Sequence, residues 1–306
     1  MDNKRVIYLD VLRIIAILMM MMIHVSGGYL GGLKVCSVQW NIAEVFQSVS
    51  RCCITLFFMI SGIFFLDDKK DVTLKSLFTR NIKRIVTAFL FWSLFYAVFA
   101  CINEKTSDVK TLVKVFIQQT LAGHYHMWFL FTICGIYLIV PMLRKICEDK
   151  VIFKYSILVA IILTYVLPLI AQLIDPYTSF LSGYLGDIKY TFISGYVFIF
   201  MLGRLLYENE ITKKKEWLVY ILGIGGVITT YVTTWNYGRI YNVYAIQNSE
   251  YTDLAVVLFA SAVFVFFKQH VSKLRFSDKQ KKWIGVISKY SFGMYLVHDV
   301  MNFYFI

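Results

Sequence analysis

Three ionisable residues lie on one stripe of the first apolar segment. Asp10 and Arg13 are three residues apart, the spacing of neighbours on one face of an α-helix. His24 follows Arg13 by eleven residues. At 100° per residue it lies on about the same face, roughly 16 Å further along the axis. A charge pair near one membrane surface and an imidazole near the other is what a catalyst acting across a membrane needs. The alternatives are that Arg13 reaches back to the headgroups and that His24 is an interfacial residue.

The composition requires a membrane around these residues. Of 306 residues, 58% are hydrophobic and only 16% are charged, whereas about 25% are charged in a soluble domain. One soluble core cannot bury so much apolar surface, and the same figures exclude a disordered chain or a small disulfide scaffold. The six cysteines have no metal-binding spacing, so we interpret them as core thiols.

Apolar runs of about 20 residues, long enough to cross the hydrocarbon layer, recur along the whole chain. They cover residues 7–27, 43–66, 84–102, 127–146, 151–174, 188–208, 216–236, 251–269 and 287–306. Helices are expected because backbone in lipid must satisfy its own hydrogen bonds. We predict an all-α polytopic membrane protein, a bundle of about nine transmembrane helices. It forms a single domain over residues 1–306 without a separate soluble domain, and the first helix is retained rather than cleaved. Residues 103–126 also have helical spacing.

The distribution of basic residues predicts the orientation. About 23 of the 31 Lys and Arg residues fall in alternate segments between the runs, beginning with Lys4 and Arg5. By the positive-inside rule the N-terminus is cytoplasmic, and nine spans place the C-terminus outside. We therefore expect a multi-pass protein of the cell membrane. Its net charge of +12 reflects topology and contact with anionic membrane lipids, and we expect no nucleic-acid partner.

A set of motifs in a fixed order resembles the integral-membrane acyltransferase-3 family. The first is Tyr8-Leu-Asp-Val-Leu-Arg13 followed by His24. The others are Phe57-Phe58-Met-Ile-Ser61-Gly62, Arg80-Asn-Ile-Lys83-Arg84, His126-Met-Trp128-Phe-Leu, the block GYVFIFMLG over 195–203, and Ser291-Phe-Gly-Met-Tyr295-Leu-Val-His298. Two departures stand out: the family usually has ten or more spans, and Ile54-Thr55 replaces a frequent Val-Pro pair.

The resemblance implies a membrane O-acyltransferase. Such an enzyme moves an acyl group, commonly acetyl, from cytoplasmic acyl-CoA to a hydroxyl of an extracytoplasmic glycan or lipid-linked sugar. The family's essential arginine and histidine correspond to Arg13 and His24. The imidazole would act as the base, or would carry the acyl group as an acyl-histidine. Asp10 would be the catalytic partner of Arg13, and Arg13, Arg80 and Arg84 would bind the phosphates of acetyl-CoA.

Four further residues are candidates for binding the substrate. Arg51 lies two turns from Glu44 on one helix face, so it either forms an ion pair with Glu44 or lies near the thioester or acceptor. His126 and Trp128 are expected level with His24 at the outer surface, as a wall of the acceptor site. The competing interpretation of Trp128 is the aromatic belt of the membrane. His298 is either a substrate contact or a buried, hydrogen-bonded histidine.

Other functions fit parts of the sequence. His124 and His126 have the spacing of two metal ligands, but no third ligand is evident, so we expect no metal. A transporter or flippase would also use intramembrane charges and the glycine-rich segment 223–226, but the chain has no matching pair of interrupted helices. Some relatives form the membrane part of racemase-linked resistance proteins, and no racemase domain follows here.

Overall fold

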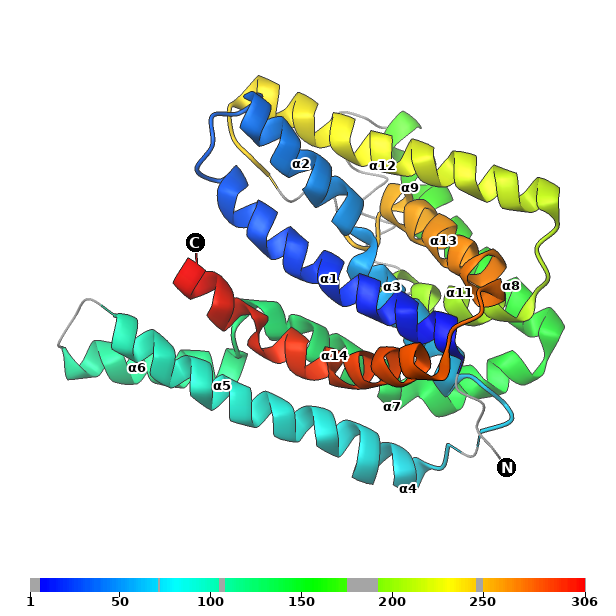
Figure 1. Ribbon diagram of the computed structural model, residues 1–306, viewed down its shortest axis with the longest axis horizontal. Coiled ribbons are helices and arrows are strands. Elements are labelled where there is room, and N and C mark those ends of the chain that lie inside the picture. The colour runs from blue at the N-terminus through cyan, green and yellow to red at the C-terminus, as the bar shows by residue number, and fades with distance from the viewer. Residues whose placement is uncertain (1–5, 71, 105–107, 175–191, 246–249, 306) are drawn as a thin grey trace. The chain divides into compact units, whose positions relative to one another are not determined.

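The structure, a computed structural model, describes residues 6–70, 72–104, 108–174, 192–245 and 250–305, and every regular element in these ranges is a helix (Figure 1). The first half contains α1 (Ile7–Leu30), α2 (Val38–Ser50), α3 (Cys52–Phe65), α4 (Leu74–Ser76), the π-helix η1 (Leu77–Ile82), α5 (Lys83–Asn103), α6 (Val109–Ala122) and the 3₁₀-helix η2 (Tyr125–Met127). The second half contains α7 (Trp128–Glu148), α8 (Lys150–Ile161), the π-helix η3 (Ile162–Val166), α9 (Leu167–Ile174), α11 (Gly195–Glu208), α12 (Lys213–Tyr241), α13 (Leu254–Gln269), the 3₁₀-helix η5 (Val271–Lys273) and α14 (Asp278–Phe305).

The predicted fold class is confirmed. Seven helical stretches of the described residues are long and apolar enough to cross a membrane. α11 occupies residues 195–208 of the predicted sixth span, and α14 contains most of the ninth. Residues 188–191 and 306 of those spans, like Lys4 and Arg5, lie outside the described residues. The count of nine spans, the orientation and the single-domain organisation stay predictions.

The second predicted span is interrupted at Arg51. α2 ends at Ser50 and α3 begins at Cys52, although Arg51 keeps helical dihedral angles (φ −54°, ψ −30°). The two halves differ in chemistry: α3 buries mostly apolar side chains, whereas α2 buries Glu44, Gln47 and Ser48. The predicted apolar run therefore contains a polar buried section in its first half.

The described helices belong to two compact units. The first comprises residues 1–64 and 154–306. In it α1 packs against α2 along one side and α14 along another, while α12 packs against α13 and α2 (Figure 1). The second unit comprises residues 65–153, and in it α5 packs along α6 and also contacts α7. The helical spacing predicted for residues 103–126 is thus confirmed by α6.

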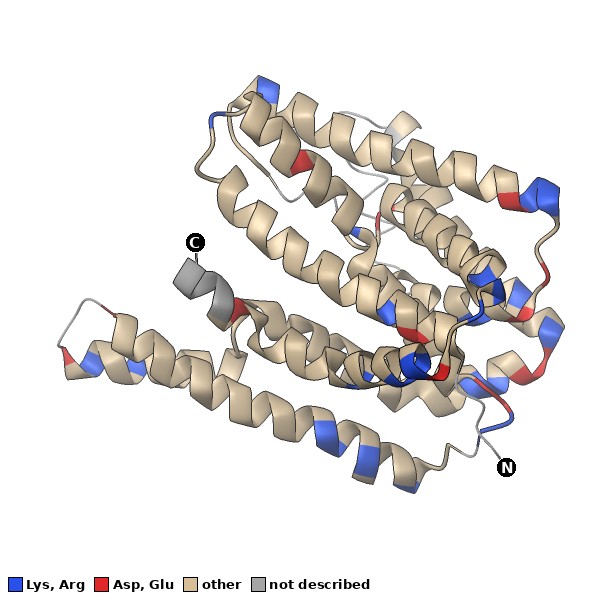
Figure 2. Cartoon of the chain, viewed as in Figure 1, with Lys and Arg blue, Asp and Glu red and all other residues tan. Residues whose placement is uncertain are grey.

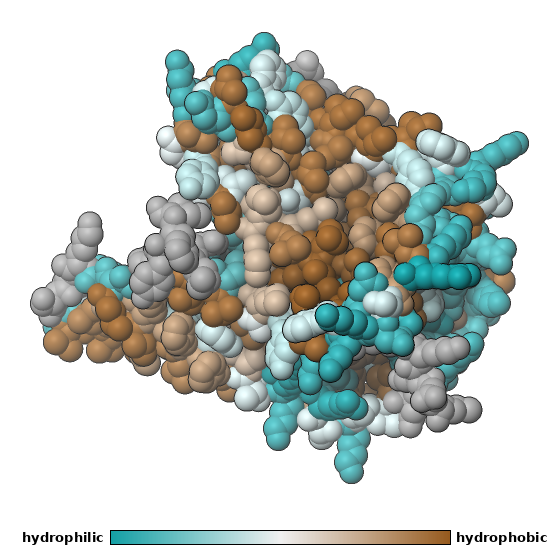
Figure 3. Space-filling model, in the orientation of Figure 1, coloured by the Kyte–Doolittle hydropathy of each residue, from teal (hydrophilic) through white to brown (hydrophobic). Residues whose placement is uncertain are grey.

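Large apolar side chains on the surface mark the faces expected to meet lipid. In the second unit α5 exposes Phe91 and Ile102, and the left-hand part of α5 and α6 that faces the viewer in Figure 3 is mostly hydrophobic. In the first unit α12 exposes Trp217, Ile221 and Ile228. Exposed apolar surface of this extent is expected in a bilayer and not in water.

Basic residues gather at helix ends, and two of them cap other helices. Figure 2 shows Lys and Arg at the N-terminal ends of α12 and α14. In the first unit Lys268 Nζ donates to the carbonyl oxygens of Leu206, Tyr207 and Asn209, each at 2.7 Å. In the second unit Arg144 donates to the carbonyl oxygens of Phe65, Asp67 and Lys70 at 2.8–3.0 Å. Lys268 satisfies carbonyl groups that the end of α11 leaves without helical partners, and Arg144 binds the last residue of α3 and the segment that follows it.

Two glycines let α3 and α11 cross at backbone contact. A Cβ added at Gly62 would collide with the backbone of Phe200, and one added at Gly203 would collide with the backbone of Met59. The close helix packing expected of small residues in membrane proteins is therefore present at Gly62. The crossing fixes α3 against α11 near Phe200 and Gly203.

Substituting Gly62 by alanine is expected to lower the melting temperature of the purified protein. The added methyl group meets backbone, which cannot rotate away, so overpacking of about 1–3 kcal/mol or more is expected. Gly225→Ala is the matched control, because a Cβ at Gly225 meets nothing within 4 Å. Thermal unfolding in detergent measures both variants, and equal melting temperatures would contradict the close crossing.

Candidate functional site

The predicted pairing of Asp10 with Arg13 is confirmed, and a third residue joins it. Arg13 Nη1 donates to Asp10 Oδ1 at 3.4 Å and to Ser288 Oγ at 3.1 Å. Ser288 Oγ in turn donates to Asp10 Oδ1 at 2.6 Å. Asp10 is buried, and Arg13 is half-buried with its guanidinium over the ring of Phe64, 5.5 Å from the centroid. The triangle fixes the charged end of the α1 stripe against α14.

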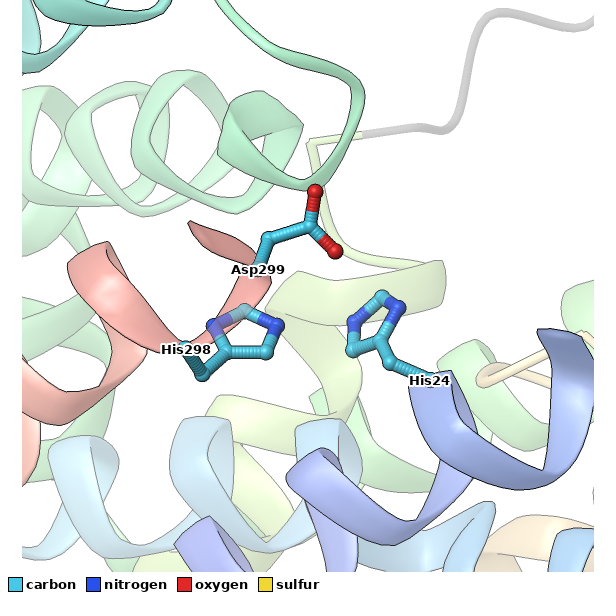
Figure 4. Close-up of side chains that lie close together, drawn as sticks. All are labelled: His24, His298 and Asp299. Carbon is cyan, nitrogen blue, oxygen red and sulfur yellow. The ribbon is translucent and has the colours of Figure 1, made fainter. Parts of the chain in front are cut away.

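His24 meets a second histidine at the other end of this helix pair. The rings of His24 on α1 and His298 on α14 have centroids 4.7 Å apart and are tilted by 44°. Figure 4 shows both rings converging with the carboxylate of Asp299. His24 and Asp299 are half-buried and His298 is buried. An imidazole pair beside a carboxylate can take up, hold and pass a proton.

One hydrogen bond defines the proton arrangement of His298. Its Nδ1 lies 2.7 Å from the carbonyl oxygen of Tyr295. Because a carbonyl oxygen only accepts, Nδ1 carries the hydrogen and Nε2 of the neutral ring is an acceptor. His298 is therefore buried and hydrogen-bonded, and it lies beside His24. Its predicted role as a substrate contact stays a prediction.

The same three residues have the spacing of a metal site. One ligand atom each from His24, His298 and Asp299 lies within 4.8 Å of the other two. Two histidines and one carboxylate are a donor set that suits Zn²⁺, and the Nδ1 bond to Tyr295 is the usual support of a ligating histidine. The same spacing serves a hydrogen-bonded acid–base cluster, so the expectation of no metal stays a prediction.

Arg51 and Glu44 are buried together in the polar section of the second span. Glu44 Oε1 accepts from Ser48 Oγ at 3.0 Å, and the guanidinium of Arg51 lies over the ring of Tyr251, 5.3 Å from its centroid. Among the described residues, Arg51 Nε and Nη2 form no hydrogen bond of normal geometry, although Tyr244 and Tyr251 interact with the guanidinium. Such unsatisfied buried groups mark a place for water or a polar ligand.

His126 and Trp128 lie at the start of α7 in the second unit. His126 is buried, and its Nδ1 lies 2.9 Å from Nδ1 of His124. The ring of Tyr96 stacks on His124 with centroids 4.3 Å apart and meets His126 edge-on at 5.3 Å. Trp128, half-buried, is the first residue of α7. The expected level of these residues with His24 stays a prediction.

Arg80 and Arg84, the predicted coenzyme ligands, lie where η1 continues into α5. Arg80 is on the π-helix and Arg84 is the second residue of α5, and both are exposed. π-helical turns are often found at functional sites. Arg80 and Arg84 belong to the second unit, whereas Arg13 belongs to the first. That these two arginines bind the donor together with Arg13 stays a prediction.

Sequence reasoning did not name Ser288 and Asp299. Ser288 is ten residues before His298 on one helix, and Asp299 is its neighbour in the chain, so both were visible as polar residues of a predicted span. Their contacts with α1 depend on how two distant helices pack, which helical periodicity does not describe.

Comparison with known proteins identifies the family. A family model described as an acyltransferase domain matches residues 6–306. No curated protein and no solved structure matches the chain. The matched range includes every residue of the stripe on α1 and of its contacts on α14. The chain therefore belongs to the acyltransferase-3 family of membrane acyltransferases.

Proposed function

We propose that this protein transfers an acyl group, acetyl in the first instance, from cytoplasmic acyl-CoA to a hydroxyl of an extracytoplasmic glycan or lipid-linked sugar. The observation that carries the proposal is the position of His24 in a member of an acyltransferase family. The imidazole of His24 lies beside His298 and Asp299 of α14. α1 carries both His24 and Arg13. Together these groups provide a base and a cation on one helix.

The reaction follows from this arrangement. An unprotonated ring nitrogen of His24 takes the proton of the acceptor hydroxyl, and the oxygen attacks the thioester carbonyl carbon. A C–O bond forms, the C–S bond breaks, and the coenzyme thiolate leaves and recovers the proton from the imidazolium. His298 and Asp299 would stabilise the imidazolium, in the manner of a carboxylate that orients a catalytic histidine. In the alternative route His24 itself holds the acyl group before passing it on.

Charged residues would position the two substrates. Arg13, held by Asp10 and Ser288, would present its guanidinium to the phosphates of the donor molecule. Arg80 and Arg84 would add cations for its phosphates. Arg51, His126 and Trp128 are the proposed contacts to the acceptor, and Arg51 contributes buried N–H groups that form no hydrogen bond of normal geometry among the described residues.

Binding and transfer of the donor test the proposed function. Purified protein in nanodiscs should bind acetyl-CoA saturably, as measured by calorimetry and by a rise in melting temperature. With radiolabelled acetyl-CoA as the donor, it should then transfer the labelled acetyl group to glycans of the cell envelope. Absence of binding by folded protein would favour transport of a small or lipid-linked substrate instead. Metal analysis of the same sample and assay after chelation decide whether the His24 cluster holds an ion, because the base mechanism requires transfer without one.

A further inference from the structure

A pocket lies at the N-terminal end of α1, apart from the histidine cluster. Its volume is about 650 Å³, within the range of roughly 300–1,000 Å³ that small-molecule sites occupy. Its walls come from three stretches of the first unit: the start of α1, η5, and the segment that leads into α14. The residues that matter for its chemistry are Tyr8, Ser272, Arg275, Phe276 and Lys281. We call it the basic pocket.

The charge of the basic pocket favours an anion. Arg275 and Lys281 line it, and residues 273–282 contain five Lys or Arg residues against Asp278 as the one acid. Lys281 Nζ bonds to Asp278 at 3.1 Å, which leaves the ammonium further donors. Figure 2 shows this basic start of α14. A guanidinium fork near a flexible ammonium is suited to phosphate groups.

Two aromatic rings in the lining suggest that the ligand of the basic pocket has a flat ring in addition to phosphate groups. Tyr8 is buried and Phe276 is half-buried, and both line the same volume as the cations. Planar bases stack on such rings. A phosphorylated nucleotide has both features, charged phosphates and a flat aromatic base, and its size suits the volume better than inorganic phosphate does.

The location connects the basic pocket to the proposed chemistry. α1 contributes Tyr8 to the pocket and, further along, Arg13 and His24. α14 contributes Lys281 to the pocket, then Ser288 seven residues later, then His298. Seventeen residues separate Lys281 from His298, which is about 25 Å of helix. The pocket therefore lies at one end of the α1–α14 pair and the histidines lie at the other.

We infer that the basic pocket binds the phosphorylated nucleotide end of the acyl-CoA donor. This inference rests on the proposed function and specifies where its donor docks. In the predicted orientation the pocket faces the cytoplasm, and the charged nucleotide stays out of the lipid. Arg275 and Lys281 bind phosphate oxygens, and Phe276 stacks on the base. Phosphate groups also occur on anionic lipids, so the test separates these two sources.

The test uses the full chain in nanodiscs of neutral phosphatidylcholine. The double variant Arg275→Ala/Lys281→Ala is expected to bind CoA about tenfold more weakly or worse, since it loses charge-assisted hydrogen bonds. The matched control is Lys279→Ala/Lys282→Ala, which removes two charges from the same stretch outside the pocket lining and should bind CoA like the unmodified protein. Adenosine 3′,5′-bisphosphate, which has the nucleotide end without the thioester arm, should compete with CoA for the unmodified protein.

Each outcome decides one question. Equal CoA affinity of the double variant and the control, or no competition by the bisphosphate, overturns the inference while CoA binding itself keeps the proposed function. If the double variant loses CoA affinity only in nanodiscs that contain phosphatidylglycerol, the pocket is assigned to a lipid headgroup. That result also overturns the inference. Failure of the unmodified, folded protein to bind CoA at all contradicts the proposed function instead. All four cations are exposed, so the variants are expected to fold.

Discussion

The variant His24→Ala is expected to transfer acyl groups about 10²–10⁴-fold more slowly than the unmodified protein, the usual contribution of a general base. Binding of the donor should stay nearly intact, because the proposed donor contacts begin with Arg13, roughly 16 Å away along α1. Single-turnover transfer from labelled acetyl-CoA and calorimetric binding of CoA measure the two effects separately.

His270→Gln is the histidine control for this experiment. His270 Nε2 lies 2.8 Å from Glu216 Oε1 at the end of α13, and glutamine can replace that hydrogen bond. Transfer by this variant should equal that of the unmodified protein. Joint loss of donor binding and transfer in His24→Ala would contradict the assignment of His24 as the base. Trapping of labelled acetyl on the unmodified protein, but not on His24→Ala, would distinguish the acyl-histidine route from direct attack.

Replacing Arg13 by alanine is expected to weaken donor binding by about 1.5–3 kcal/mol, or roughly 10- to 150-fold. This is the range for loss of a hydrogen bond to a charged group. Arg13→Lys should restore only part of the affinity, because an ammonium cannot present the bidentate fork of a guanidinium. Calorimetry with CoA measures both variants.

A structural role of Arg13 predicts a different pattern. If Arg13 serves only to hold Asp10 and Ser288, the alanine variant keeps its CoA affinity and loses melting temperature instead. Ser288→Ala removes the hydroxyl shared by the pair and leaves the guanidinium in place, so it is the control for loss of the triangle. A fall in CoA affinity in Ser288→Ala as large as in Arg13→Ala would show that the triangle, and not the cation, governs binding.

The sequence predicted those features that depend on one helix at a time. Length and hydrophobicity predict α1, α5, α7 and α12 because a lipid-spanning helix needs a long apolar run. The three-residue spacing of Asp10 and Arg13 predicts their contact because neighbours on one helix face are set by helix geometry alone. The interruption at Arg51 falls within an apolar run whose buried polar residues form contacts with other segments, such as Tyr251.

Contacts between distant helices could not be predicted in this way. His298 was a candidate substrate contact or a buried histidine, and its actual neighbour is His24, 274 residues earlier in the chain. Ser288 likewise reaches Asp10 across 278 positions. Such pairs are fixed by how α1 and α14 pack against each other. The spacing of residues within one helix does not predict which residues of another helix they will contact.

The bond network between α1 and α14 also constrains how the protein is made. Arg13 precedes its partner Ser288 by 275 residues, so at roughly 5–20 residues per second α1 waits about 14–55 s for α14 to be synthesised. Throughout this interval Asp10 and Arg13 have each other as partners but lack Ser288, and the imidazole of His24 lacks its neighbours on α14, on a helix bound for lipid where incompletely paired polar groups are costly. The nascent chain therefore depends on water, headgroups or the insertion machinery to shelter α1 until the bundle closes, and an arrest of translation before Ser288 should leave a chain that membrane quality-control proteases remove.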